Sequence, residues 1–264
     1  MLKKYARLYK SFTIQYLKIL MQSKVNFFIG LFGFFCLQAT GIAFIYLIFQ
    51  RIPSLNGWNL DEVAFIYGFS QLPRGLDHLI TDFIWIFSQN IIVRGEFDRY
   101  LLRPINPLFQ LIVERFQPDG FGEILIGLIL VVISSSHLHM KFGFLDILLF
   151  TVVVISGSVI YASIKLFFAS FAFWIKSSIS ILDMIYSLSD FAKYPIGIYS
   201  RVIQVIITFI IPFAFTAFIP AGYFIGKVPV KLAVFGTVLA SILSFTMAYT
   251  VFQKGINSYE SAGN

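Results

Sequence analysis

Long apolar segments alternate with short polar ones along this chain, and most of the apolar segments match the length of a membrane-spanning helix. Such a helix needs about 20 consecutive, mostly apolar residues. The pattern predicts spanning helices over residues 25–49, 62–81, 107–140, 146–175 and 230–253, with one further crossing between the last two. We therefore expect an all-α integral membrane protein, with residues 1–264 forming a single domain of six transmembrane helices.

The fifth crossing has two candidates. Residues 177–195 are moderately apolar but carry charges, whereas residues 202–226 are uncharged but contain Pro212 and Pro220. Proline lacks the N–H that a helix interior needs. Residues 202–226 can therefore form either the spanning helix or two short pieces that enter the membrane and return. Both choices give six crossings and the same orientation.

The first 24 residues contain six cations and no acid. In a helix, five large apolar residues would share one face at three- and four-residue spacing: Tyr5, Leu8, Phe12, Tyr16 and Ile19. A basic amphipathic helix before a span lies in the cytoplasmic headgroup layer. The alternative is a disordered basic leader that only sets the topology.

Composition agrees with a membrane protein. The chain is 58% hydrophobic, 18% aromatic and 12% charged, whereas soluble domains carry about 25% charged residues. The net charge of +7 sits in short segments beside apolar spans, so we expect a lipid bilayer as surroundings and no nucleic-acid partner. Cys36 is the only cysteine, which excludes an intrachain disulfide framework.

The cations also predict the orientation. With residues 177–195 as the fifth span, twelve of the 20 Lys and Arg residues fall on the side of the N-terminal segment and six on the other. Cytoplasmic loops carry the excess of cations. Both termini and residues 82–106 are therefore expected in the cytoplasm.

The longest polar interruption is RGEFDRYLLRPINPLFQ, over residues 94–110. It mixes charges with large apolar residues, and its prolines prevent a continuous helix. We expect a compact docking element with one apolar side on the cytoplasmic face. The residues predicted to make the contact are Arg94, Gly95, Phe97, Asp98, Tyr100, Leu101, Arg103 and Pro104.

Several charges fall inside the predicted spans: Arg74, Asp77, Lys165 and Asp183. Arg74 and Asp77 would share a helix face, so they can pair within the membrane, or a tilted helix can carry both to the headgroups. Lys165 can reach the inner surface or pair with an acid on another helix.

No enzyme motif is recognisable. The chain has no phosphate-binding loop, no GxSxG elbow and no HExxH helix. His137 and His139 are two residues apart, do not share a helix face and are predicted to be interfacial rather than metal ligands. We expect no catalytic residue, metal or cofactor in this chain.

Three stretches resemble a known family: GEFDRYLLRPINPLFQL (95–111), YPIGIYSRVIQVIITFIIPFAFTAFIPA (194–221) and the tail GINSYESAGN (255–264). They are similar to motifs of type-2 ABC exporter membrane subunits, in the six-helix permease branch long catalogued as a domain of unknown function. The resemblance covers essentially the whole chain.

The resemblance implies a type-2 ABC transporter fold with residues 177–195 as the fifth helix. Residues 196–226 would form a re-entrant hairpin on the outer side, with Tyr194, Pro195, Pro212 and Pro220 at its gate. With that resemblance, we expect a bacterial plasma-membrane exporter of an amphiphilic or hydrophobic compound. Its partners would be a second permease, identical or related, and two copies of an ATPase subunit that binds the ATP and Mg.

Two other functions fit the residues alone. An ion-coupled transporter or channel would use Arg74, Asp77, Asp183 and Asp190 as an ion relay, and a scaffold or sensor subunit would transport nothing.

Overall fold

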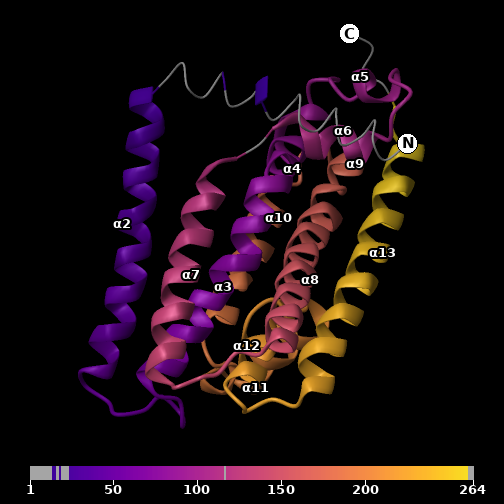
Figure 1. The fold of residues 1–264 in the computed structure, drawn as a ribbon. Helices are drawn as coiled ribbons and strands as arrows, with labels where there is room; N and C mark the ends of the chain where they lie inside the picture. Colours follow the sequence, from indigo (N-terminus) through magenta and orange to yellow (C-terminus); the bar gives the residue numbers. More distant parts are fainter. Residues whose placement is uncertain (1–13, 16–17, 19–23, 116, 261–264) are drawn as a thin grey trace.

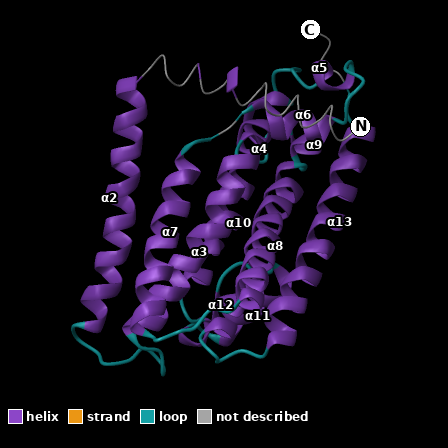
Figure 2. Cartoon of the chain, in the orientation of Figure 1, coloured by secondary structure: helices purple, strands orange, loops and turns teal. Residues whose placement is uncertain are grey.

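The computed structural model describes residues 14–15, 18, 24–115 and 117–260 (Figure 1). Nearly all of the predicted interfacial helix over residues 1–24 lies outside this part, as do the last four residues of the tail. Throughout the described part, regular structure is helical and no strand occurs (Figure 2). This agrees with the all-α fold class.

Five long helices run side by side along the described part of the chain (Figure 1). They are α2 (Lys24–Phe49), α3 (Leu60–Thr81), α7 (Asp119–His137), α8 (Phe144–Ala169) and α13 (Gly236–Asn257). Short elements gather at both ends of this bundle.

We call one end the α5 end and the other the α11 end (Figure 1). The α5 end carries α4 (Phe83–Ile86), the π-helix η2 (Phe87–Ile91), α5 (Asp98–Leu101), α6 (Pro107–Glu114) and α9 (Ala172–Ile175). The α11 end carries α11 (Arg201–Val205), η5 (Ile206–Ile210), η6 (Phe213–Phe215), α12 (Phe218–Phe224) and η7 (Lys231–Phe235).

Length and hydropathy allow three described helical segments to cross a membrane: Asp119–His137, Phe144–Ile175 and Lys231–Asn257. A fourth is possible if Arg201–Ile210 and Phe213–Phe224, which meet at 74°, count as one broken span. Helix α3 lies among these helices but carries several charges. Six crossings therefore stay a prediction.

The segment predicted as the fifth helix, residues 177–195, differs from a continuous span. It forms α10 (Ile179–Ser187), the 3₁₀ helix η3 (Leu188–Lys193) and then extended backbone at Tyr194. Pro195 accounts for the end, because the residue before a proline is disfavoured in helical conformation. The short η4 (Ile196–Ile198) follows.

Helix α3 begins where a capping box forms. The Asn59 side chain accepts from the Glu62 N–H, and the Glu62 carboxylate accepts from the Asn59 N–H, both at 2.9 Å. This satisfies two backbone donors at the helix start. Glu62 also pairs with Lys227 at 2.6 Å, which ties α3 to the segment after α12 at the α11 end.

Helices α3 and α7 approach each other closely through glycines. Gly68 faces Gly127 and Gly75 faces Gly120, and a Cβ added at any of the four would press on the backbone of the opposite helix. Small residues at such crossings let membrane helices pack backbone to backbone. The pair gives α7 a fixed register against α3, which positions the charges described next.

Candidate functional site

The polar element at the α5 end is built from tight turns. The chain leaves η2, turns at Gly95 with a φ of +67°, and forms the single helical turn of α5. Helix α6 then begins at Pro107, with the Asn106 side chain accepting from the N–H groups of Leu108 and Phe109. A positive φ suits glycine, and proline suits the first helical position.

Phe97 anchors this element by packing against residues of its own chain. Its side chain is 0% exposed. Its ring lies 5.0 Å from that of Phe173, 5.2 Å from Tyr259 and 5.7 Å from Tyr100, measured between centroids. Tyr100 is buried as well. The prediction that these two side chains contact a partner protein is therefore wrong, because their own helices enclose them.

The polar side of α5 is held by an ion pair and a hydrogen bond. The Arg99 guanidinium lies 3.2 Å from the Glu114 carboxylate and donates to the Tyr100 hydroxyl at 2.9 Å. Burial and the Glu114 charge raise the pKa of Tyr100. Because Arg99 is half exposed, we assign this pair a positioning role with little net stability.

The exposed face of the element begins directly after the buried Tyr100. Leu102 is 85% exposed, and Leu101, Arg103 and Pro104 are also exposed. Of the residues predicted to make a docking contact, Leu101, Arg103, Pro104 and Arg94 face outward, while Gly95 and Asp98 are half-buried. We call residues 101–104 the α5 face. Leu102 belongs to it, although the prediction omitted this residue.

The tail of the chain closes over the same element. Tyr259 packs on Phe97, and Gly255 passes directly against the Phe173 ring, where a larger residue has no room. Burial first, and then the neighbouring Asp98 carboxylate, raise the pKa of Tyr259 to about 12. The first and third of the quoted motifs are thus in contact, a relation that their separation in the sequence hides.

A cluster of charges lies in the half of the bundle nearer the α5 end, and all of its charged side chains are buried or half-buried except that of Asp190, which is 59% exposed. Lys165 and Asp77 form an ion pair at 2.8 Å, and both side chains are 0% exposed. The Tyr186 hydroxyl donates to Asp77 at 2.8 Å, and the Thr81 hydroxyl donates to it as well. The pair joins α3 to α8, and Tyr186 adds α10.

The cluster continues from Arg74 on the same helix. Arg74 lies 2.9 Å from Asp190, which also pairs with Lys193 at 2.7 Å. Glu123 on α7 lies 3.8 Å from Arg74 and 3.0 Å from His78. Arg74 and Asp77 therefore do not pair with each other, because each forms its ion pairs with residues on other helices.

We call this set the α3 ion cluster. Within the described residues it places three cations among three carboxylates: Arg74, Lys165 and Lys193 with Asp77, Glu123 and Asp190. Charges at membrane depth persist when paired and turned toward protein. Asp183 is exposed and lies outside the cluster. Glu123 and Lys193 were missed, although both are charges within predicted helical segments.

The predicted gate residues lie in and beside the bent segment of the α11 end. Tyr194 packs near Tyr67 of α3, with ring centroids 6.3 Å apart, and Pro195 follows it. Pro212 separates η5 from η6 at the bend, and Pro220 is buried within α12. His137 lies 2.9 Å from Asp61, and the described residues contain no group of three metal-ligating side chains.

Comparison with family models decides the classification. The model described as "ABC-2 family transporter protein" matches residues 35–263, which include the first two quoted motifs and all but the last residue of the third. The chain belongs to the ABC-2 transporter family. The resemblance drawn from the motifs is confirmed. Comparisons with curated proteins and with solved structures give no match.

Membership of the ABC-2 family has direct consequences. It makes the chain a multi-pass membrane protein of the ABC permease type, and the family implies an ABC ATPase as partner. In such proteins the ATPase is typically a separate subunit.

Proposed function

We propose that this ABC-2 family protein is the permease subunit of an ATP-driven exporter of an amphiphilic or hydrophobic compound. One observation carries the proposal most directly. In a chain without a phosphate-binding loop, the α5 face is presented to the outside on a support of buried aromatic rings. Such a permease must receive mechanical work through a contact, and this face is suited to one.

The support beneath the α5 face reaches several helices. Phe87 of η2 lies 5.4 Å from Phe173 of α9 and 6.0 Å from Phe252 of α13, between ring centroids. The Ser178 N–H donates to the Ser88 carbonyl at 2.9 Å, which joins the start of α10 to η2. Close-packed aromatic contacts transmit displacement because they compress little. A push on α5 would thus move α10 and α13 together.

The assembly we propose has two permeases, identical or related, above two ATPase subunits that bind ATP and Mg. The membrane would be the bacterial plasma membrane, with the α5 end and both termini in the cytoplasm. The cation distribution along the sequence supports this orientation.

Cysteine labelling tests the orientation. In a Cys36→Ala background, Lys141→Cys at the α11 end should react with an impermeant maleimide on intact cells. Arg103→Cys at the α5 end should react only after the membrane is opened. Both positions are exposed in the structure, so a difference in labelling would reflect the side of the membrane and not burial of the side chain. Labelling of Arg103→Cys but not of Lys141→Cys on intact cells would reverse the proposed topology.

Export measurements test the function. Export from cells or vesicles should stop with vanadate, or when the phosphate-binding lysine of the partner ATPase is replaced, and should persist when ionophores collapse ion gradients. The α3 ion cluster favours one rival function, an ion-coupled transporter. Export that ionophores abolish and that continues with the inactive ATPase would establish that rival instead.

A further inference from the structure

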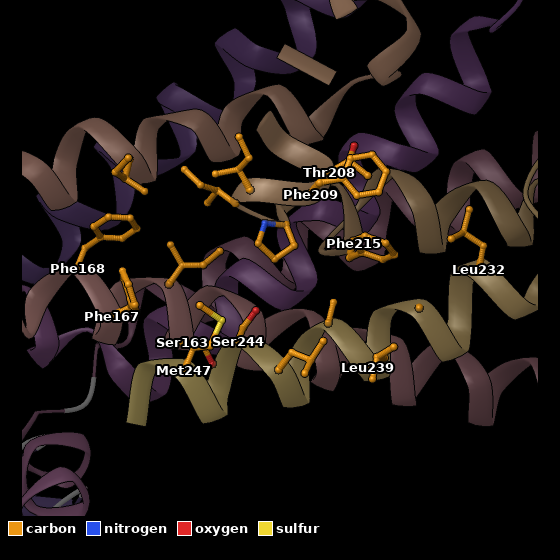
Figure 3. Close-up of a pocket in the computed structure, with 18 residues that line it drawn as sticks. Ser163, Phe167, Phe168, Thr208, Phe209, Phe215, Leu232, Leu239, Ser244 and Met247 are labelled. Carbon is orange, nitrogen blue, oxygen red and sulfur yellow. The ribbon is translucent and has the colours of Figure 1, made fainter. Parts of the chain in front are cut away.

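A groove of about 790 Å³ lies between α8, α13 and the bend between η5 and η6 (Figure 3). Its walls are mainly aromatic and aliphatic side chains, among them Phe167, Phe168, Phe209, Phe215, Leu243 and Met247. A volume of a few hundred to about 1,000 Å³ suits one small-molecule ligand. Phe209 and Met247 are exposed, so the groove opens onto the outer surface of the bundle.

The lining residues carry no charge. The desolvation of an ionised headgroup would therefore go uncompensated there. Three hydroxyl groups line the groove, from Ser163, Thr208 and Ser244. Ser163 donates to the Val159 carbonyl at 2.6 Å, whereas Thr208 and Ser244, both half-buried, have no hydrogen-bond partner among the described residues.

The bend supplies one further polar group, the Thr208 carbonyl. In a regular helix the Thr208 carbonyl would accept from the residue four or five positions later. Pro212 has no N–H, and the Phe213 N–H donates to the Ile211 carbonyl instead. Irregular backbone at membrane depth is tolerated where it lines a cavity, and this carbonyl lies in a segment that lines the groove.

We propose that the groove binds an uncharged amphiphile, with its apolar body against the aromatic wall and one hydroxyl or amide group at Thr208 and Ser244. The inference deepens the proposed function and rests on it, because it names the class of compound that the exporter carries. The compound would enter sideways from the bilayer past Phe209 and Met247.

Photolabelling of the full chain in lipid nanodiscs tests the binding. The probe is a long-chain alcohol carrying a diazirine, compared with the matching diazirine alkane and the ionised diazirine fatty acid. The alcohol should label residues 206–212 and 239–247, and excess unlabelled alcohol should compete. Labelling by the fatty acid should be weaker by about tenfold, or about 1.4 kcal/mol. Equal labelling by all three probes would overturn the proposal.

Two matched substitutions on α13 locate the site. Ala240 lines the groove, whereas Ile242 is exposed on the same helix and does not. Ala240→Phe should fill the groove and reduce alcohol labelling by about tenfold, while Ile242→Phe should leave it unchanged. Thr208→Val, which keeps the shape, should weaken labelling by the alcohol but not by the alkane. Equal labelling of the Ile242→Phe and Ala240→Phe proteins would contradict the site.

The same variants separate this inference from the proposed function. Labelling needs no ATP, so a loss of the competed alcohol signal concerns the groove alone. ATP dependence of export concerns the function alone. In the complete exporter, Ala240→Phe should abolish export of the alcohol and Ile242→Phe should not. Export that continues through the Ala240→Phe complex would overturn the assignment of the groove to the transported compound.

Discussion

Lys165→Met should lower the free energy of unfolding by about 3–5 kcal/mol, because breaking one side of a buried ion pair leaves the other charge uncompensated. Asp77 would be that charge. Its side chain is 0% exposed, and among the described residues only the hydroxyl groups of Thr81 and Tyr186 would still donate to its carboxylate. For a domain of this size the expected fall in melting temperature is roughly 10 °C.

The double substitution decides whether the pair causes the loss. Lys165→Met combined with Asp77→Asn removes both charges, so it should recover most of the stability lost in Lys165→Met alone. Asp183→Asn is the matched control, since Asp183 is exposed and lies outside the cluster. Thermal unfolding of the purified variants in the same detergent provides the measurement. Losses that simply add would show that Lys165 and Asp77 do not interact.

Long apolar runs in the sequence indicate long helices, because a membrane-spanning helix needs about 20 mostly apolar residues. The predicted segments over residues 25–49 and 62–81 lie close to α2 and α3. The apolar runs did not predict the break within residues 177–195. There Asp190 and Lys193 bind Arg74 and each other, and those tertiary contacts have no periodicity to detect.

The partners of the buried charges were also beyond the sequence. Helical spacing puts Arg74 and Asp77 on one face, which made a pair between them plausible. The observed partners come from α7, α8 and η3, and only the packing of those helices brings them together. The glycine contacts of α3 with α7 that position Glu123 depend on the same packing.

The α5 element shows a similar limit. Phe97 and Leu102 are both large apolar residues in one polar stretch, and hydropathy alone treats them alike. The structure buries Phe97 against Phe173 and Tyr259 and leaves Leu102 exposed. Whether an apolar side chain faces its own helices or a partner depends on the fold around it.

This difference leads to the second large effect. Phe97→Ala should destabilise the isolated permease by about 3–5 kcal/mol, because it removes a buried ring and leaves a cavity. Leu102→Asp should leave the melting temperature of the permease nearly unchanged, because the side chain is 85% exposed. The same change should weaken binding of the ATPase by about 2 kcal/mol or more if Leu102 is a central contact of that interface.

Substrate-stimulated ATP hydrolysis, measured per folded complex, tests the coupling role of the α5 face most directly. Leu101→Asp and Leu102→Asp should reduce the stimulation to the basal rate while the permease stays folded. Val132→Asn is the control for a polar change at an exposed apolar position, here on α7. We expect it to keep full stimulation in every complex that folds. Normal stimulation in both the Leu101→Asp and Leu102→Asp complexes would contradict the account.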